Sequence, residues 1–167
     1  MNIFVLDNDP IIAAQMECDS HVCKMLLEST QMLHTINSLF NLPHTYKPTH
    51  ANHPSTVWAR ASKQNWEWLF VHTVALFEEY SYRYEKIHKC LDALLLFENV
   101  ANRPVLPDIG LTPFAQAMPD HYKDPDAVKA YRAYYLGEKS RFAKWNKTRS
   151  KPEWWIETNN TKINSEL

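Results

Sequence analysis

The chain has 167 residues, of which 45% are hydrophobic and 22% charged, so it has the length of one domain and is too apolar for a disordered protein. Its 2 glycines and 10 prolines leave little material for β-hairpins and exclude Gly-rich phosphate loops and dinucleotide-binding fingerprints. A net charge of −1 excludes an overall basic field that attracts nucleic acid or an anionic membrane. Any such binding site must be local.

The chain carries no signal that places it in a membrane or outside the cell. Its first seven residues, MNIFVLD, lack a cationic segment, and no run approaches the ~20 apolar residues of a membrane span. Cys18, Cys23 and Cys90 lack C-x-x-C spacing, which favours reduced thiols. We expect a cytoplasmic protein without a bound metal or cofactor.

The spacing of the prolines predicts the fold class. Because proline is tolerated in the first turn of a helix but not in its interior, the three Pro-free windows 11–42, 55–103 and 126–151 indicate helical blocks. The sequence therefore predicts an all-α, single-domain helical bundle with long Pro-rich connectors. We expect the domain to cover 1–155 and the polar tail, 156–167, to fray.

The first two helical blocks have recognisable starts. Asp9-Pro10 reads as a helix cap followed by Pro at the first helical position, and the apolar periodicity predicts a helix to about Phe40. A Pro- and His-rich connector, 41–54, follows. Ser55 or Thr56 can cap a second block, which we expect to break near 88–89 into a shorter helix that ends around residue 99.

The rest of the chain divides into a loop and a last helical block. Residues 100–125 hold five prolines and one glycine, which predicts a long ordered loop of the kind that often carries function. Asp124-Pro125 then repeats the Asp-Pro start and opens a helical block through residue 151.

Four polar residues of the first block share one helix face. His21, Lys24, Glu28 and Gln31 recur at steps of three and four. A solvated face gives the same pattern, but such faces are usually built from interchangeable Lys and Glu. The mixture of imidazole, cation, acid and amide instead points to chemistry.

The last block carries a local positive charge. Between residues 138 and 155, six cations face two acids, with four aromatic residues among them. Cations that neutralise phosphates beside rings that stack on bases are typical of nucleic-acid binding, although a solvated helix end looks similar. The candidate DNA contacts here are Lys139, Arg141, Lys144 and Trp145.

These patterns resemble two groups of proteins. Nearly the whole chain resembles a widespread group of phage proteins, which implies no particular activity. Residues 1 to about 84 resemble the pyrimidine dimer DNA glycosylase/AP lyase family, the endonuclease V of T-even phages and its bacterial relatives. The matching residues are Met1-Asn2-Ile3-Phe4, Asp19 and His21 before Glu28, Lys24-x-x-x-Glu28-x-x-Gln31, Asn52-His53-Pro54, Trp58 and Arg83.

The resemblance implies an all-α enzyme whose chain-terminal amine attacks the C1′ atom of a damaged nucleotide. Because Asn2 is large, we expect Met1 to be retained and to supply this amine. Glu28 matches the family's catalytic glutamate, and His21 and Lys24 are expected to line the site.

This mechanism requires the amine of Met1 to lie close to the Glu28 carboxylate, which we expect at the floor of a cleft lined by Lys24 and Arg60. The remaining DNA-binding candidates are then Gln31, Asn52, His53, Trp58, Arg60 and Arg83.

Two other hypotheses stay open from the sequence. In the first hypothesis, the protein is a non-catalytic phage accessory protein that binds a host or phage protein through its aromatic surface, which agrees with the near-neutral charge. Alternatively, it is an enzyme that acts on a free nucleotide, with Glu28, His21 and His53 as acid/base groups.

Overall fold

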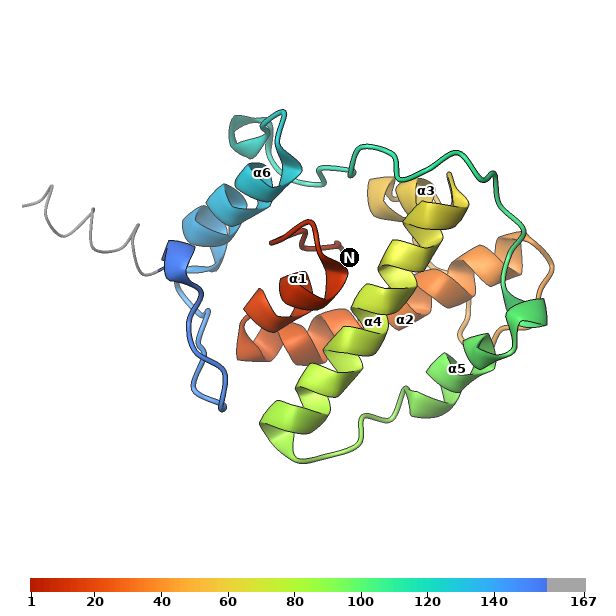
Figure 1. Cartoon of the computed structure of the whole chain (residues 1–167), viewed down its shortest axis with the longest axis horizontal. Coiled ribbons are helices and arrows are strands. Elements are labelled where there is room, and N and C mark those ends of the chain that lie inside the picture. Colours follow the sequence, from red (N-terminus) through yellow and green to blue (C-terminus); the bar gives the residue numbers. More distant parts are fainter. Residues whose placement is uncertain (156–167) are drawn as a thin grey trace, which may run out of the picture.

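The computed structural model of the chain describes residues 1–155, and these residues form helices joined by long connectors (Figure 1). The helices are α1 (Pro10–Met16), α2 (Asp19–Leu39), α3 (Pro54–Ala59), α4 (Lys63–Tyr84), α5 (Leu91–Leu95) and α6 (Ala127–Tyr134). Short 3₁₀ turns lie at Leu96–Glu98, Val100–Asn102 and Asp120–Tyr122, and a π-helical turn, Tyr135–Lys139, follows α6. Since 1–155 contain no β-strand, the predicted all-α fold class is confirmed. The predicted tail, 156–167, lies outside the described residues.

The core forms where α1 and α2 both pack against α4. The extended N-terminal segment is part of this core, because Ile3, Phe4, Val5 and Leu6 are all buried. In the part of the chain that is described, no helix has both the length and the apolar character that a membrane span needs.

The first predicted helix consists of two helices. Asp9 caps α1 as expected, since its carboxylate accepts from the backbone N–H groups of Ile11 and Ile12. The chain is then extended at Glu17 and Cys18, so the prediction of one helix from residue 9 to 40 is wrong.

The later helices begin at different caps from those predicted. His53 caps α3 and Ser62 caps α4, which ends at Glu85 in the left-handed conformation (φ 52°). Asp126, not Asp124, caps α6.

The last predicted helical block is wrong beyond the π-helical turn, since residues 140–152 are not helical. Tertiary contacts replace the helical hydrogen bonds there. The backbone N–H of Asp19 donates to the carbonyl of Lys144 (2.9 Å), and the backbone N–H of Asn146 donates to the Asp19 carboxylate (2.7 Å).

The 100–125 loop runs along one edge of the molecule past α3 to α6 (Figure 1). Buried Asn65 holds it, because its amide donates to the Thr112 hydroxyl (2.7 Å) and accepts from the Thr112 backbone N–H (2.9 Å). Gly110 adopts a positive φ of 87°, and its carbonyl accepts from the Ser62 hydroxyl (2.9 Å). These bonds confirm the prediction of a long ordered loop.

A buried arginine joins α4 to the junction of α1 and α2. The guanidinium of Arg83, of which 4% is exposed, donates to Glu79 (2.8 Å) and Asp19 (3.1 Å). It also donates to the backbone carbonyls of Glu17 (2.7 Å) and Gln15 (2.9 Å). These carbonyls end α1, where helical partners are missing.

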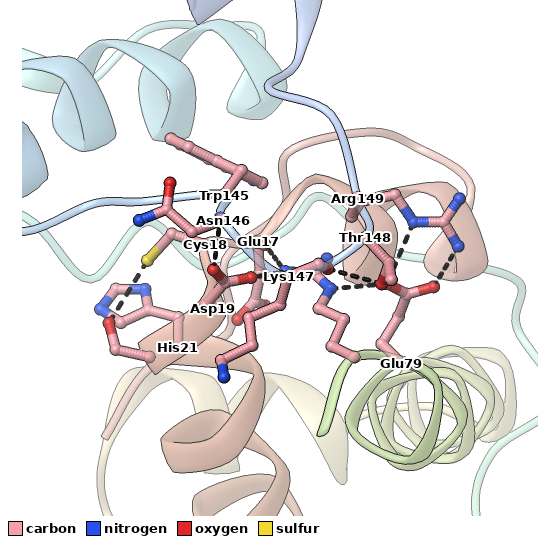
Figure 2. A network of polar contacts seen from close by, with 12 residues as sticks. Glu17, Cys18, Asp19, His21, Glu79, Trp145, Asn146, Lys147, Thr148 and Arg149 are labelled. Atoms are coloured by element: carbon pink, nitrogen blue, oxygen red, sulfur yellow. Dashed lines mark hydrogen bonds and ion pairs between the residues drawn. The ribbon is translucent and has the colours of Figure 1, made fainter. Parts of the chain in front are cut away.

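The same carboxylates hold residues 144–149, which we call the C-terminal strap. Figure 2 shows Arg149 directed at the carboxylate of Glu79, to which it donates from two nitrogens. Trp145 is buried, and its indole N–H donates to the carbonyl of Met16 (3.2 Å). The strap and Arg83 therefore share the partners Glu79 and Asp19.

We expect Arg83→Met to lower the free energy of unfolding by about 3–5 kcal/mol, because it leaves buried carboxylates and carbonyls without their partner. Urea titrations followed by circular dichroism measure the change. Arg141→Met, at an exposed position, is the control and should stay within about 0.5 kcal/mol of the wild type. Equal stability of the two variants would contradict a structural role for Arg83.

Candidate active site

The N-terminal amine and the Glu28 carboxylate form an ion pair. The nitrogen of Met1 lies 3.4 Å from Glu28 Oε2, so the predicted closeness of the two groups is confirmed. This oxygen is buried and makes no hydrogen bond within residues 1–155, which leaves the ion pair as its compensating contact. An amine that can attack a carbonyl carbon thus touches a group that can move protons.

The side chain of Met1 is a structural anchor. Only 3% of it is exposed, it packs against the hydrophobic core, and its sulfur accepts from the Thr56 hydroxyl (3.8 Å). Since Met1 as a whole is half-buried, its exposed atoms belong to the main chain. The fold therefore buries the side chain of the first residue and leaves its backbone end accessible.

A pocket of about 310 Å³ opens beside this ion pair. It is lined by Met1, Glu28, Gln31, Tyr46, Lys47, Pro48, Thr49 and His50. One wall comes from the N-terminus and α2, and the other from the connector between α2 and α3. The volume lies at the lower end of the range for small-molecule pockets.

Hydrogen bonds to α2 hold the connector wall in place. The backbone N–H of Thr49 donates to the Thr35 hydroxyl (3.1 Å), whose own proton is shared between the carbonyls of Gln31 (2.8 Å) and Thr49 (3.2 Å). Buried His34 accepts from the backbone N–H of Thr45 (3.1 Å) at Nδ1, so its Nε2–H donates to the Ala93 carbonyl (3.0 Å). Burial lowers the pKa of His34, in agreement with this neutral tautomer.

His53 lies within electrostatic range of the ion pair. Burial is the main cause that lowers its pKa, and the positive charges of the terminal amine and His50 lower it further, whereas Glu28 acts in the opposite direction. His53 Nδ1 accepts from the backbone N–H of Ser55 (3.2 Å). The ring is therefore a neutral cap of α3 next to the site.

Of the other residues predicted near Glu28, Gln31 lines the pocket wall, whereas Lys24 does not. Lys24 is exposed, with its ammonium 3.9 Å from Glu28 Oε1. Asn52 is exposed on the connector. Arg60 does not line the pocket, because its guanidinium donates to the carbonyl of Ala51 and so secures the connector.

The structure corrects the placement of His21, which does not line the pocket. Its ring is 5% exposed and stacks on Phe4, with the ring centroids 4.6 Å apart. Its Nδ1 accepts from the Tyr135 hydroxyl (2.9 Å). Burial, with the charges of Lys139 and Lys24, lowers the pKa of His21 to about 3. The ring is a neutral core group, so the prediction from helical spacing that His21 lines the site with Glu28 is wrong.

Three aromatic or basic candidates are also structural. Trp58 is buried and donates to the Thr112 carbonyl (3.3 Å), while Trp145 and Arg83 hold the strap and the helix junction. Arg141 and Lys144 are exposed.

Lys139 is half-buried, with its ammonium 4.8 Å from the ring centroid of Tyr134. Of the four DNA-binding candidates in the last block, only the three cations thus remain open to a ligand.

The connector wall was not predicted from the sequence. Tyr46, Lys47, Thr49 and His50 carry no pattern that links them to Glu28, because they follow α2 in an irregular segment. The run of prolines and histidines predicted a connector, but it did not predict that the connector packs beside Glu28. Residues 1–155 contain no group of three or more metal-ligating side chains.

No family model, curated protein or solved structure matches the chain. The function is therefore inferred from the site itself, together with the residues that carry the family resemblance.

The stability of the protein should depend on pH through His21. Below its ordinary pKa of 6.5, His21 binds a proton in the unfolded state but not in the folded state. The contribution of His21 to the free energy of unfolding is therefore present above pH 6.5 and is lost as the pH falls. Between about pH 7.5 and about pH 5, wild type should lose about 2 kcal/mol more than His21→Gln. Urea titrations at both pH values measure this.

His121→Gln serves as the control, because His121 is exposed. Its pH dependence should equal that of the wild type. If His21→Gln and the wild type lose the same amount, His21 is not a buried neutral group.

Proposed function

We propose that the protein is a DNA glycosylase/AP lyase that acts on damaged or modified pyrimidines through the N-terminal amine of Met1 and the carboxylate of Glu28. The observation that carries the proposal is their 3.4 Å contact in the wall of an open pocket. The resemblance to the glycosylase family assigns catalytic roles to the same two groups. Geometry and resemblance therefore support one mechanism independently.

The mechanism uses the two groups in sequence. Glu28 takes a proton from the Met1 ammonium, and the neutral amine attacks C1′ of a nucleotide flipped into the pocket. The C1′–N bond to the base breaks as Glu28 passes that proton to the departing base. Glu28 then relays a proton from the attached nitrogen to O4′, so that the sugar ring opens and an imine forms. Glu28 then takes a proton from C2′, and the C3′–O bond breaks with release of the phosphate. Water hydrolyses the imine and restores the amine.

Local cations supply the contacts to phosphate in this proposal. Lys24 lies next to the ion pair and Lys47 lines the pocket. Arg141 and Lys144 are exposed, and the carbonyl of Lys144 is bonded to the first residue of α2. Such contacts provide affinity without reading sequence, so the lesion must be recognised by the pocket.

A free nucleotide is a second candidate substrate. The pocket, at about 310 Å³, has the size for one small ligand. The same amine and carboxylate would then act on a sugar that is not part of a DNA strand.

Borohydride should trap a covalent adduct between Met1 and DNA that contains an abasic site. Glu28→Gln should slow formation of this adduct at least about 10²-fold, because it removes the proton acceptor. The yield is measured on denaturing gels with untagged protein. The matched control is Glu67→Gln on α4. Glu67 pairs with Lys63, four residues before it, as Glu28 pairs with Lys24, but it lies outside the site.

A one-residue N-terminal extension should abolish the adduct. Absence of an adduct with the native N-terminus would overturn the lyase mechanism. An adduct that forms only with free nucleotides would favour the second candidate.

DNA binding should weaken with salt through the exposed cations. Arg141→Gln with Lys144→Gln should reduce the slope of log affinity against log salt by about 2, one for each cation that no longer neutralises a phosphate. Fluorescence anisotropy with a short duplex at about 50 and about 200 mM salt measures this slope. The control pair is Lys86→Gln with Lys89→Gln, which are also exposed. No binding at the lower salt would favour an accessory protein that binds another protein.

A further inference from the structure

The residue after the proposed nucleophile is bonded to a distant part of the chain. Asn2 is 8% exposed, and its amide donates to the carbonyl of Ala117 (2.8 Å). Its Oδ1 accepts from the hydroxyl of Tyr131 (3.0 Å) and from the backbone N–H of Ile3 (2.8 Å). The side chain of Asn2 thus bridges the N-terminal segment, the 100–125 loop and α6.

Tyr131 is the centre of this arrangement. It is fully buried on α6, and its hydroxyl oxygen lies 3.0 Å from Asn2 Oδ1 and 2.8 Å from the Ala115 carbonyl, so that these two acceptors share its one proton. The hydroxyl oxygen accepts from the Ala117 backbone N–H (3.3 Å). Burial raises the pKa of the phenol, so the hydroxyl keeps its proton. We call Asn2, Ala115, Ala117 and Tyr131 the N-terminal clamp.

The clamp limits where the amine can lie. The nitrogen of Met1 is three bonds from the nitrogen of Asn2, and only one rotatable backbone bond of Met1 separates the amine from the fixed peptide group. The Met1 side chain is itself buried. A fixed Asn2 and a fixed Met1 side chain therefore hold the amine against Glu28.

We propose that Asn2 and Tyr131 are positioning residues for the amine of Met1, and that the 100–125 loop serves the site through them. This inference rests on the proposed function, because positioning matters for catalysis only if the amine is the nucleophile. The clamp itself has a consequence that needs no substrate: it keeps the amine paired and partly enclosed.

The test combines two measurements on Tyr131→Phe and Asn2→Leu. Leucine is used because a small second residue would expose Met1 to excision. Reductive methylation of the Met1 amine by formaldehyde and cyanoborohydride, followed by mass spectrometry, should become at least about 5-fold faster in both variants, because each loses more than one buried hydrogen bond of the clamp.

Single-turnover trapping on saturating abasic DNA should become slower, by up to about 10²-fold, because the nucleophile is misplaced. The dissociation constant for DNA should not change. The opposite signs of the two effects distinguish misplacement of the amine from general loss of structure, which tryptophan fluorescence also monitors.

Tyr134→Phe is the matched control, since it removes a hydroxyl from the same helix that makes no hydrogen bond within the described residues. Both of its rates should equal those of the wild type. Unchanged methylation in Tyr131→Phe and Asn2→Leu would overturn the clamp. Faster methylation with unchanged trapping would overturn the positioning role. Faster methylation in a protein whose wild type traps no DNA would retain the clamp and reject the proposed function.

Discussion

The buried guanidinium of Arg83 is the interaction on which the rest of the structure depends. It satisfies two carbonyls at the end of α1 and pairs with Asp19 at the start of α2 and Glu79 on α4. The direction of α2, and therefore the place of Glu28, follows from this junction. An arginine suits the position because its planar group donates in several directions at once and remains charged when buried. The C-terminal strap closes over the same carboxylates through Arg149.

The site itself depends on segments that are far from it in sequence. A chain terminus usually frays, but here residues 3–6 are buried and Asn2 is bonded to Ala117 and Tyr131. The connector wall is held from α2 and, through Arg60, from the end of α3. The catalytic candidates therefore lie on fixed elements, which is the arrangement that precise positioning requires.

The sequence predicted what local spacing determines. Proline spacing gave the all-α class, Asp9-Pro10 gave the start of α1, and the step of four from Lys24 to Glu28 gave neighbours on one helix face. It failed where distant contacts decide. The apolar periodicity continues through Glu17 and Cys18, so only the contacts of Asp19 with Arg83 and the strap explain the break there. Likewise, helical spacing cannot tell which polar face is covered, and Tyr135, on the π-helical turn after α6, packs against His21.

Net charge says little about what a ligand meets at the pocket. The terminal amine and the Lys24 ammonium lie 3.4 and 3.9 Å from the Glu28 carboxylate, and Lys47 lines the same pocket as Glu28, although the whole chain carries a charge of −1. Two of the acidic groups, Asp19 and Glu79, are buried against arginines and so do not face a ligand. His53 stays neutral beside the amine, because burial and the positive charge of the amine lower its pKa. An anionic ligand at this pocket therefore meets a locally positive surface, which attracts phosphate over distances of about 10 Å.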